Sequence, residues 1–396
     1  MSPRAVFILL MSLNLLNYID RQILFAVFPL IKQDLFLTDT QLGVLASMFM
    51  VVYMLAAPVI GFFADRTPRQ IWISLSAFIW SAATILSGFA KNYANLLFAR
   101  SAIGIGEAGF TSVSPSFVSE GFAKKKRAQI LGLFGAALPL GSALGYILGG
   151  WLGPSLGWRN AFFIVGIPGA LIAFFVFFKV KDKRAASKEQ KPKFSAYAKL
   201  LKNKSFSYTC FAQAMATFTL GAMAAWMPSF FHRYLNFSVA DAGLAFGLIT
   251  VVCGAAGTFL GGYLADKLLV KTNKAYFIVS GLSFLTALPF GALALLLRDV
   301  YAALACLSVA VILIFMQSGP MNAVIVSVTK LRVRSMAFAL NIFIIHALGD
   351  ALSPAFIGRI SDGWGLKMAL FCSIFFLLPA LAFTVLAAHH YREEEN

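Results

Sequence analysis

Four charged residues lie inside apolar runs of the sequence, where an ionised side chain is costly to bury. Asp20 and Arg21 are neighbours in the first run, and Arg100 and Glu107 lie seven residues apart in the fourth. Both runs are long enough to cross a bilayer as helices. A charged side chain at the bilayer centre costs about 2.5–3.5 kcal/mol on insertion scales, so such residues persist mainly where they are paired and functional. We therefore predict a cluster of paired charges inside a helical bundle.

This cluster could couple proton transfer to the movement of an anion. Burial favours the neutral form of a carboxyl group, whereas a nearby guanidinium favours the ionised form. Arg21 stays protonated and could pair with either Asp20 or Glu107, acting as a movable counter-charge. When Arg21 moves to a substrate anion or to Glu107, Asp20 should take up a proton, which it releases when the pair reforms. We expect these three residues to form the proton-coupling site, and Asp20→Asn to abolish proton-driven uptake while sparing part of substrate binding or exchange.

A second interpretation of the same residues needs no transport. Two acids and two arginines can neutralise one another, so a static ion network that holds helices together also satisfies the cost of burial. Both interpretations remain open from the sequence alone.

Polar residues around the charges share single helical faces, at about 100° per residue. In the first run, the stripe consists of Asn14, Asn17, Tyr18 and Arg21, with Asp20 beside it. In the fourth run, the face consists of Arg100, Gly104, Glu107, Thr111 and Ser114. Neither face can point towards lipid, so each must face other helices or a water-filled cavity.

The composition predicts an all-α integral membrane protein. Of the 396 residues, 60% are hydrophobic and 12% charged, too little charge for the surface of a soluble domain of this size. We read twelve apolar runs as transmembrane helices, at 5–31, 40–64, 70–90, 93–122, 127–153, 158–180, 206–235, 239–268, 275–297, 300–329, 334–361 and 366–388. The four cysteines each fall inside a different run and are interpreted as packing residues, without a disulfide or metal role.

The charge pattern predicts the orientation of the chain. Although the net charge is +17, the basic residues fall in short loops between apolar runs, which argues against nucleic acid as a partner. Most Lys and Arg residues lie in alternate loops, together with both termini, and the positive-inside rule makes that side cytoplasmic.

The sequence also repeats. Gly61-Phe-Phe-Ala-Asp65-Arg66 recurs as Gly262-Tyr-Leu-Ala-Asp266-Lys267 at the end of the eighth run. We predict two pseudo-symmetric six-helix halves, 1–180 and 205–396, joined by a basic cytoplasmic linker at 181–204.

Three motifs resemble those of the major facilitator superfamily. Gly61-x-x-Ala-Asp65-Arg66-x-x-Arg69 resembles its loop 2–3 signature, the segment from Arg100 to Glu107 resembles its fourth-helix motif, and Glu120 with Arg127 resembles the acid–base pair at the end of that helix. The resemblance implies the coupling roles given above to Asp20, Arg21 and Glu107, and a largely architectural role for Arg100. It also implies a cytoplasmic gate that consists of Asp65, Arg66, Arg69, Glu120, Arg127 and Asp266.

Within the superfamily, two groups share the motifs that carry the buried charges. Asn17-Tyr-Ile-Asp20-Arg21 and Gly106-Glu107-Ala108 occur both in Spinster-like lysolipid transporters and in organic anion:cation symporters. Three other stretches favour the Spinster-like group: Pro139-Leu-Gly-Ser-Ala-Leu-Gly-Tyr146, Gly319-Pro320-Met-Asn322 and His346-Ala-Leu-Gly349-Asp350-Ala-Leu-Ser353-Pro354.

The second half lacks the charges of the first. Gly221 and Ala222 stand at the repeat positions of Asp20 and Arg21, so the second half lacks this charged pair. One charged half facing one largely apolar half would suit an amphiphile with an anionic head and a hydrocarbon tail. His346 and an Asp one turn away could titrate near neutrality, or could be a packing pair beside small residues. The predicted substrate cavity consists of Asn14, Asn17, Tyr18, Arg21, Arg100, Glu107, Thr111, Gln213, Trp226, Gln317, Asn322, His346 and Asp350.

These observations predict a proton-coupled transporter that works by alternating access on an anionic or zwitterionic lysolipid-like amphiphile. The alternative substrate is a small organic anion such as a sugar acid. An intramembrane enzyme or an uncoupled flippase is a third possibility, but we find no nucleophile–base motif, metal-ligand pair or nucleotide loop. We expect no cofactor, and a monomer in a bacterial-type cytoplasmic membrane whose partners are the bilayer, protons and the substrate.

Overall fold

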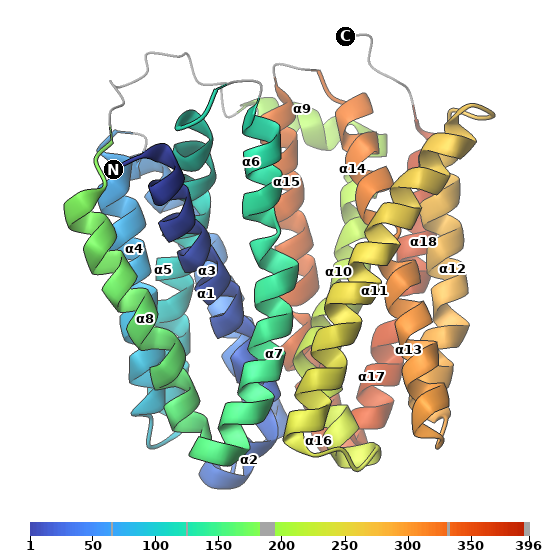
Figure 1. Ribbon diagram of the computed structural model, residues 1–396. Helices are drawn as coiled ribbons and strands as arrows, with labels where there is room; N and C mark the ends of the chain where they lie inside the picture. The colour runs from blue at the N-terminus through green and yellow to red at the C-terminus, as the bar shows by residue number, and fades with distance from the viewer. Residues whose placement is uncertain (65, 124–125, 183–194, 331–332, 392–396) are drawn as a thin grey trace. The chain divides into compact units, whose positions relative to one another are not determined.

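The computed structural model describes residues 1–64, 66–123, 126–182, 195–330 and 333–391, and all regular structure in them is helical (Figure 1). The first helices are α1 Pro3–Ala26, α2 Phe28–Leu35, α3 Asp39–Ala64, α4 Arg69–Gly88, α5 Tyr93–Glu120, α6 Arg127–Gly135, α7 Ala137–Leu156 and α8 Trp158–Lys179. The later helices are α9 Ser195–Lys202, α10 Lys204–Tyr234, α11 Val239–Leu269, α12 Ala275–Leu296, α13 Val300–Phe315, α14 Ser318–Ser327, α15 Arg334–Ile345, η3 His346–Asp350, α16 Ser353–Trp364, α17 Leu366–Ile374 and α18 Leu377–His389.

Ten helices in the described residues are long and apolar enough to cross a membrane. The two remaining predicted runs correspond to α1 with α2, and to α5. These are the helices that carry the four buried charges, so their polar content lowers the hydropathy that marks a lipid-exposed span.

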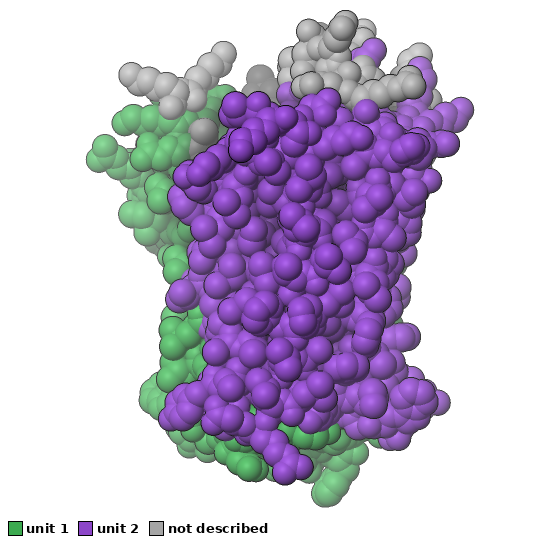
Figure 2. Space-filling model, turned by 90° about the vertical axis from the view of Figure 1, so that its right-hand side faces the viewer, with its two compact units in different colours: residues 1–188, 227–248 green, residues 189–226, 249–396 purple. Residues whose placement is uncertain are grey.

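The described chain divides into two compact units, coloured separately in Figure 2. Unit 1 consists of 1–188 and 227–248, and unit 2 of 189–226 and 249–396. The segment 227–248, which the sequence reading assigned to the second half, thus belongs to unit 1. The predicted boundaries at 180 and 205 stay predictions, since most of the proposed linker lies outside the described residues.

Glycines allow the helices of unit 1 to approach closely around the charged residues. A Cβ atom on Gly104 of α5 would lie 2.5 Å from the Phe49 carbonyl oxygen of α3, and one on Gly106 would lie 2.5 Å from the Trp80 backbone nitrogen of α4. On α7, a Cβ on Gly145 would lie 2.6 Å from the Ile19 carbonyl oxygen of α1. Because backbone atoms cannot move aside, these positions require glycine, and they fix α1 against α7 and α5 against α3 and α4.

Candidate functional site

Asp20 is held by two neighbouring helices of unit 1. Its carboxylate accepts a hydrogen bond of 2.6 Å from the Thr84 hydroxyl of α4 and one of 3.3 Å from Arg100 Nη1 of α5. The side chains of Asp20 and Arg100 are each only 1% exposed. Each charge is therefore compensated by the other away from solvent, as a buried ion pair requires.

Arg21 makes the second ion pair. Its Nε donates to Glu107 Oε2 at 2.5 Å, and the Glu107 side chain is fully buried whereas Arg21 keeps 15% exposure. The guanidinium carbon also lies 5.1–5.2 Å from the ring centroids of Tyr18, Phe49 and Tyr53. Cation–π attraction of this kind is worth roughly 0.5–2 kcal/mol per contact, so the rings help to hold a charge that remains partly accessible.

The structure thus brings together all four charged residues that the sequence singled out, and it sorts them into two pairs. The sequence allowed Arg21 to pair with either Asp20 or Glu107. In the structure Arg21 pairs with Glu107, and Asp20 pairs with Arg100. Arg100, to which the resemblance gave a largely architectural role, is therefore the direct counter-charge of a predicted coupling carboxylate.

The other predicted polar residues of unit 1 surround these pairs. Asn14 Nδ2 donates to the Phe134 carbonyl oxygen at 2.9 Å, and the Thr111 hydroxyl lies 2.6 Å from the Tyr53 hydroxyl. Both side-chain polar atoms of Asn17, and Oε1 of Glu107, are buried without a hydrogen-bond partner in the described residues. An unsatisfied buried polar group costs about 1–3 kcal/mol, so these atoms are candidates to bind water, a proton or a ligand group.

Three contributors were missed from the sequence: Thr84, Phe49 and Tyr53. The two aromatic residues lie four positions apart in one apolar run, a spacing that places them on one helical face. That spacing alone does not separate them from ordinary packing residues, and no local pattern marks Thr84.

The predicted cavity residues of the second half lie in unit 2. His346 Nδ1 lies 2.9 Å from Asp350 Oδ1 within the π-helical turn η3, and both side chains are about one quarter exposed. Trp226 Nε1 donates to the Pro354 carbonyl oxygen at 3.0 Å. Gln213 and Gln317 are buried and Asn322 is exposed.

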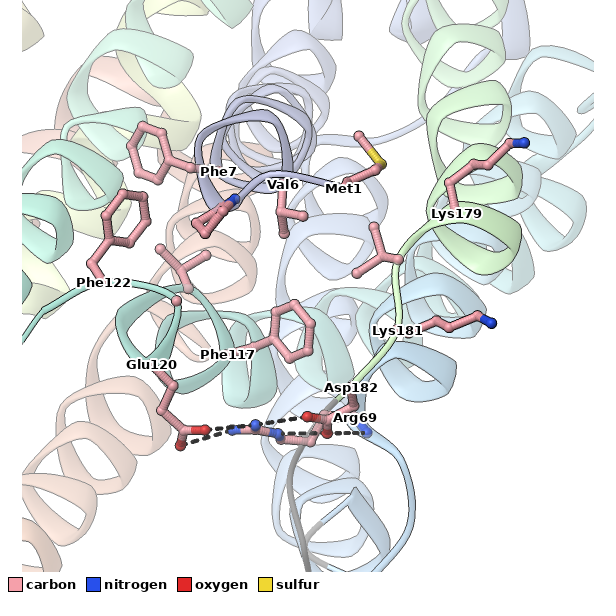
Figure 3. A pocket seen from close by; sticks show the side chains of 14 residues that line it. Met1, Val6, Phe7, Arg69, Phe117, Glu120, Phe122, Lys179, Lys181 and Asp182 are labelled. Carbon is pink, nitrogen blue, oxygen red and sulfur yellow. Dashed lines mark hydrogen bonds and ion pairs between the residues drawn. The ribbon is translucent and has the colours of Figure 1, made fainter.

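The predicted gate is centred on Arg69. Its guanidinium is bound on one side by Glu120, at 2.7 and 3.0 Å, and on the other by Asp182, at 3.0 Å (Figure 3). All three residues belong to unit 1, at the start of α4, the end of α5 and just beyond α8. Asp182 was missed because it lies in the segment assigned to the basic linker.

The other gate residues have different surroundings. Arg66 Nη1 donates to the Phe62 carbonyl oxygen at 2.6 Å, and Arg127 Nε donates to the Phe122 carbonyl oxygen at 3.3 Å. Asp266 is exposed in unit 2, and Asp65 lies outside the described residues.

A further charged cluster, to which the sequence gave no role, is centred on Asp39 at the start of α3. Arg233 of α10 binds the carboxylate through two hydrogen bonds, at 2.6 and 2.8 Å, and Lys32 Nζ of α2 lies 2.6 Å from it. The Asp39 side chain is 3% exposed. This cluster lies in unit 1 and ties the segment 227–248 to α2 and α3.

Replacing Asp39 by Asn is expected to lower the thermal stability of the purified protein by several degrees. The variant leaves Lys32 and Arg233 close together without a counter-charge. Because these two side chains keep 36% and 23% exposure, the cost lies below the roughly 3–5 kcal/mol of breaking a fully buried pair. Asp34→Asn is the matched control, because the Asp34–Arg159 pair is 45% and 36% exposed, and such surface pairs contribute about 0–1 kcal/mol. Thermal unfolding in detergent micelles measures both, and equal melting temperatures for the two variants would contradict a stabilising role for Asp39.

No group of three or more His, Cys, Asp or Glu side chains that could hold a metal ion occurs among the described residues. All four cysteines are free thiols, and Cys210 and Cys253 are buried.

Comparisons with known proteins agree with the fold and the motifs. The family model described as Major Facilitator Superfamily matches residues 10–354. The chain is 32% identical, over 374 residues, to the sphingosine-1-phosphate transporter SPNS2 of Danio rerio. This alignment covers 88% of this chain and 74% of the relative. This chain is a Spinster-like member of the major facilitator superfamily.

A second relative of this Spinster-like transporter is the probable sphingolipid transporter spinster homolog 3 of Arabidopsis thaliana, 27% identical over 97% of this chain and 84% of the relative. Among solved structures, a bacterial homolog to the human lysosomal transporter Spinster, in an inward-facing and occupied conformation, matches with a TM-score of 0.88 and 23% identity, over 98% of this chain and 97% of that one. The predictions of family, all-α membrane fold and a transporter rather than an enzyme are confirmed. The protein is an integral, multi-pass membrane transporter.

Proposed function

We propose that this Spinster-like transporter moves a single-chain amphiphile with an anionic or zwitterionic head group, and that it couples this movement to protons by alternating access. The observation that carries the proposal is the Arg21–Glu107 pair, in which a partly exposed guanidinium is the counter-charge of a fully buried carboxylate. The names of two relatives support the substrate class, since sphingosine 1-phosphate and other sphingolipids are amphiphiles.

Recognition of the head group is assigned to Arg21. It is the most exposed of the four clustered charges, and its planar guanidinium can donate two parallel hydrogen bonds to a phosphate. The rings of Tyr18, Phe49 and Tyr53 keep it oriented while it exchanges partners.

Proton coupling follows from the same exchange. When a substrate anion takes Arg21, Glu107 loses its cation in a buried site and binds a proton; when the anion leaves, Arg21 returns and the proton is released. One proton thus accompanies each anion. Asp20 keeps Arg100 and Thr84 as partners throughout the cycle, so we assign proton binding primarily to Glu107. Asp20 lies in the same charged cluster and acts on Glu107 through its electrostatic field.

Alternating access requires that the path to the substrate site opens and closes at both ends of the helices. The Asp39 cluster and the Arg69 network lie at the start of α3 and the start of α4, so the length of α3, about 39 Å at 1.5 Å per residue, separates them. We assign the Arg69 end, the basic loops and both termini to the cytoplasm, in a bacterial-type cytoplasmic membrane, and the transporter acts as a monomer. In unit 2, we assign substrate contacts to His346 and Asp350, with Gln213, Trp226, Gln317 and Asn322.

A sugar acid is the second candidate substrate, because a carboxylate fits the Arg21 guanidinium as well as a phosphate does. The deciding experiment uses purified protein in proteoliposomes, with a radiolabelled lysophospholipid or a sugar acid, with and without an imposed pH gradient. Lysophospholipid transport that the gradient accelerates supports the proposal. Transport of the sugar acid alone supports the second candidate, and transport indifferent to the gradient identifies an uncoupled flippase.

A further inference from the structure

Unit 1 contains a cavity of about 680 Å³, drawn in Figure 3, whose lining includes none of the four clustered charges Asp20, Arg21, Arg100 and Glu107. It is formed by the beginning of α1, the first residue of α4, the end of α5 and the residues that follow α8. Binding sites for small molecules commonly measure 300–1,000 Å³, so the cavity is large enough for a lipid head group with the first part of its chain.

The cavity has an apolar lining and a basic rim. Phe7 and Phe122, whose rings meet edge to face at 6.1 Å, lie on one side; Lys179 and Lys181 border the other side, and their ammonium groups are directed outwards from it (Figure 3). Val6 and Phe117 add to the apolar lining. An amphiphile can place its chain in the apolar part of this cavity and its phosphate at the two lysines of the rim.

The charge of the two lysines is not compensated in the described residues. Arg69 at the cavity floor is neutralised by Glu120 and Asp182. Lys179 and Lys181 are exposed and form no ion pair with any described residue, so the rim of the cavity favours an anion.

The position of the cavity along the helices indicates where its ligand comes from. α8 is an apolar membrane span that ends at Lys179, and α1 begins at Pro3. The two lysines therefore lie at the level where a span leaves the hydrocarbon, which is the level of the lipid phosphates.

We propose that this cavity and its basic rim bind one anionic diacyl phospholipid of the adjoining leaflet, with its phosphate at Lys179 and Lys181 and part of a chain against Phe7 and Phe122. The bound lipid connects the end of α8 to the start of α1 and borders the Arg69 network, so it stabilises this end of unit 1. The site is separate from the transport site, and the proposal does not depend on which substrate is carried.

The test measures the melting temperature of the full-length protein in detergent as dioleoyl phosphatidic acid is added. We expect saturable stabilisation, and about a tenfold or greater loss of apparent affinity in the double variant Lys179→Gln/Lys181→Gln, since a basic residue near a lipid surface contributes about 1 kcal/mol. The matched control is Lys267→Gln/Lys271→Gln, two exposed lysines outside the cavity, which should leave the affinity unchanged.

Three results would overturn the proposal: an equal loss of affinity in the control variant, equal stabilisation by inorganic phosphate, or equal stabilisation by phosphatidylcholine. Val6→Trp, which narrows the cavity without changing its charge, should also weaken the effect, and an unaltered affinity in this variant counts against the assigned position of the chain. Arg21→Gln should retain the stabilisation by phosphatidic acid, so failure of the transport proposal remains distinguishable from failure of this one.

Discussion

Glu107→Gln is expected to abolish substrate accumulation driven by a proton gradient, while exchange of labelled for unlabelled substrate persists. Glutamine keeps the shape of the side chain and can still accept a hydrogen bond from Arg21 Nε, but it cannot bind and release a proton. The variant therefore separates coupling from binding. The measurement is uptake into proteoliposomes with and without an imposed pH gradient, next to counterflow exchange at a single pH.

Asp20→Asn serves as the comparison for this experiment. The sequence-based mechanism, in which Arg21 leaves Asp20, predicts the same loss of proton-driven uptake. The mechanism proposed from the structure, in which Asp20 keeps Arg100 and Thr84, predicts a smaller loss and adds a second expectation. Arg100, 1% exposed, would keep its charge without a carboxylate, so the melting temperature should fall as well. Gradient-driven uptake at the wild-type rate in Glu107→Gln would remove Glu107 from the coupling mechanism, and the same result in Asp20→Asn would remove Asp20.

Arg21→Gln is expected to weaken binding of a phosphate-bearing lysolipid about 10- to 100-fold. A hydrogen bond to a charged group contributes about 1.5–3 kcal/mol, and each 1.4 kcal/mol is a factor of ten in Kd. Equilibrium binding to the purified protein measures the change. A monoacylglycerol of the same chain length, which lacks the phosphate, should bind the wild type and the variant equally.

Arg21→Lys is the matched control, because it keeps the charge and loses the planar fork that binds two phosphate oxygens and stacks on the rings of Tyr18 and Tyr53. Its affinity should lie between those of the wild type and Arg21→Gln. If Arg21→Gln weakens the phosphate-bearing and the uncharged lipid to the same extent, Arg21 shapes the site and does not recognise the anion.

The clustering of the four charges could be predicted from the sequence because burial allows few alternatives. A carboxylate or guanidinium in an apolar run must find an opposite charge, and only two runs of the first half supply them. Both helices, their polar faces and the transporter family follow from that constraint and from the motifs around it.

The pairing within the cluster could not be predicted with the same ease. Successive residues on a helix point about 100° apart, so Asp20 and Arg21 are directed towards different neighbours despite being adjacent in sequence. In the structure, Asp20 is directed towards α4 and α5, where Thr84 and Arg100 lie, and Arg21 is directed towards Glu107. Which neighbour each meets depends on the rotation and depth of α1 in the bundle, which the close approach at Gly145 sets.

The charged clusters at the helix ends were harder to anticipate. Asp39 and Arg233 are 194 positions apart, and Arg69 and Asp182 are 113 positions apart. A single acidic residue at the end of an apolar run looks like a solvated loop residue in the sequence. Only the folded chain distinguishes the buried Asp39 from the exposed Asp34.

The Arg233–Asp39 contact has a consequence for assembly from separate pieces. If the gene were cut between the codons for residues 182 and 195 and the two products were made together in one cell, the second would begin before α10 and would carry Arg233, whereas Asp39 would stay on the first. The later fragment thus contains a segment that completes the compact unit of the earlier one. Reconstitution of the transporter from two polypeptides would then be directed by a two-point ionic contact in addition to apolar surface.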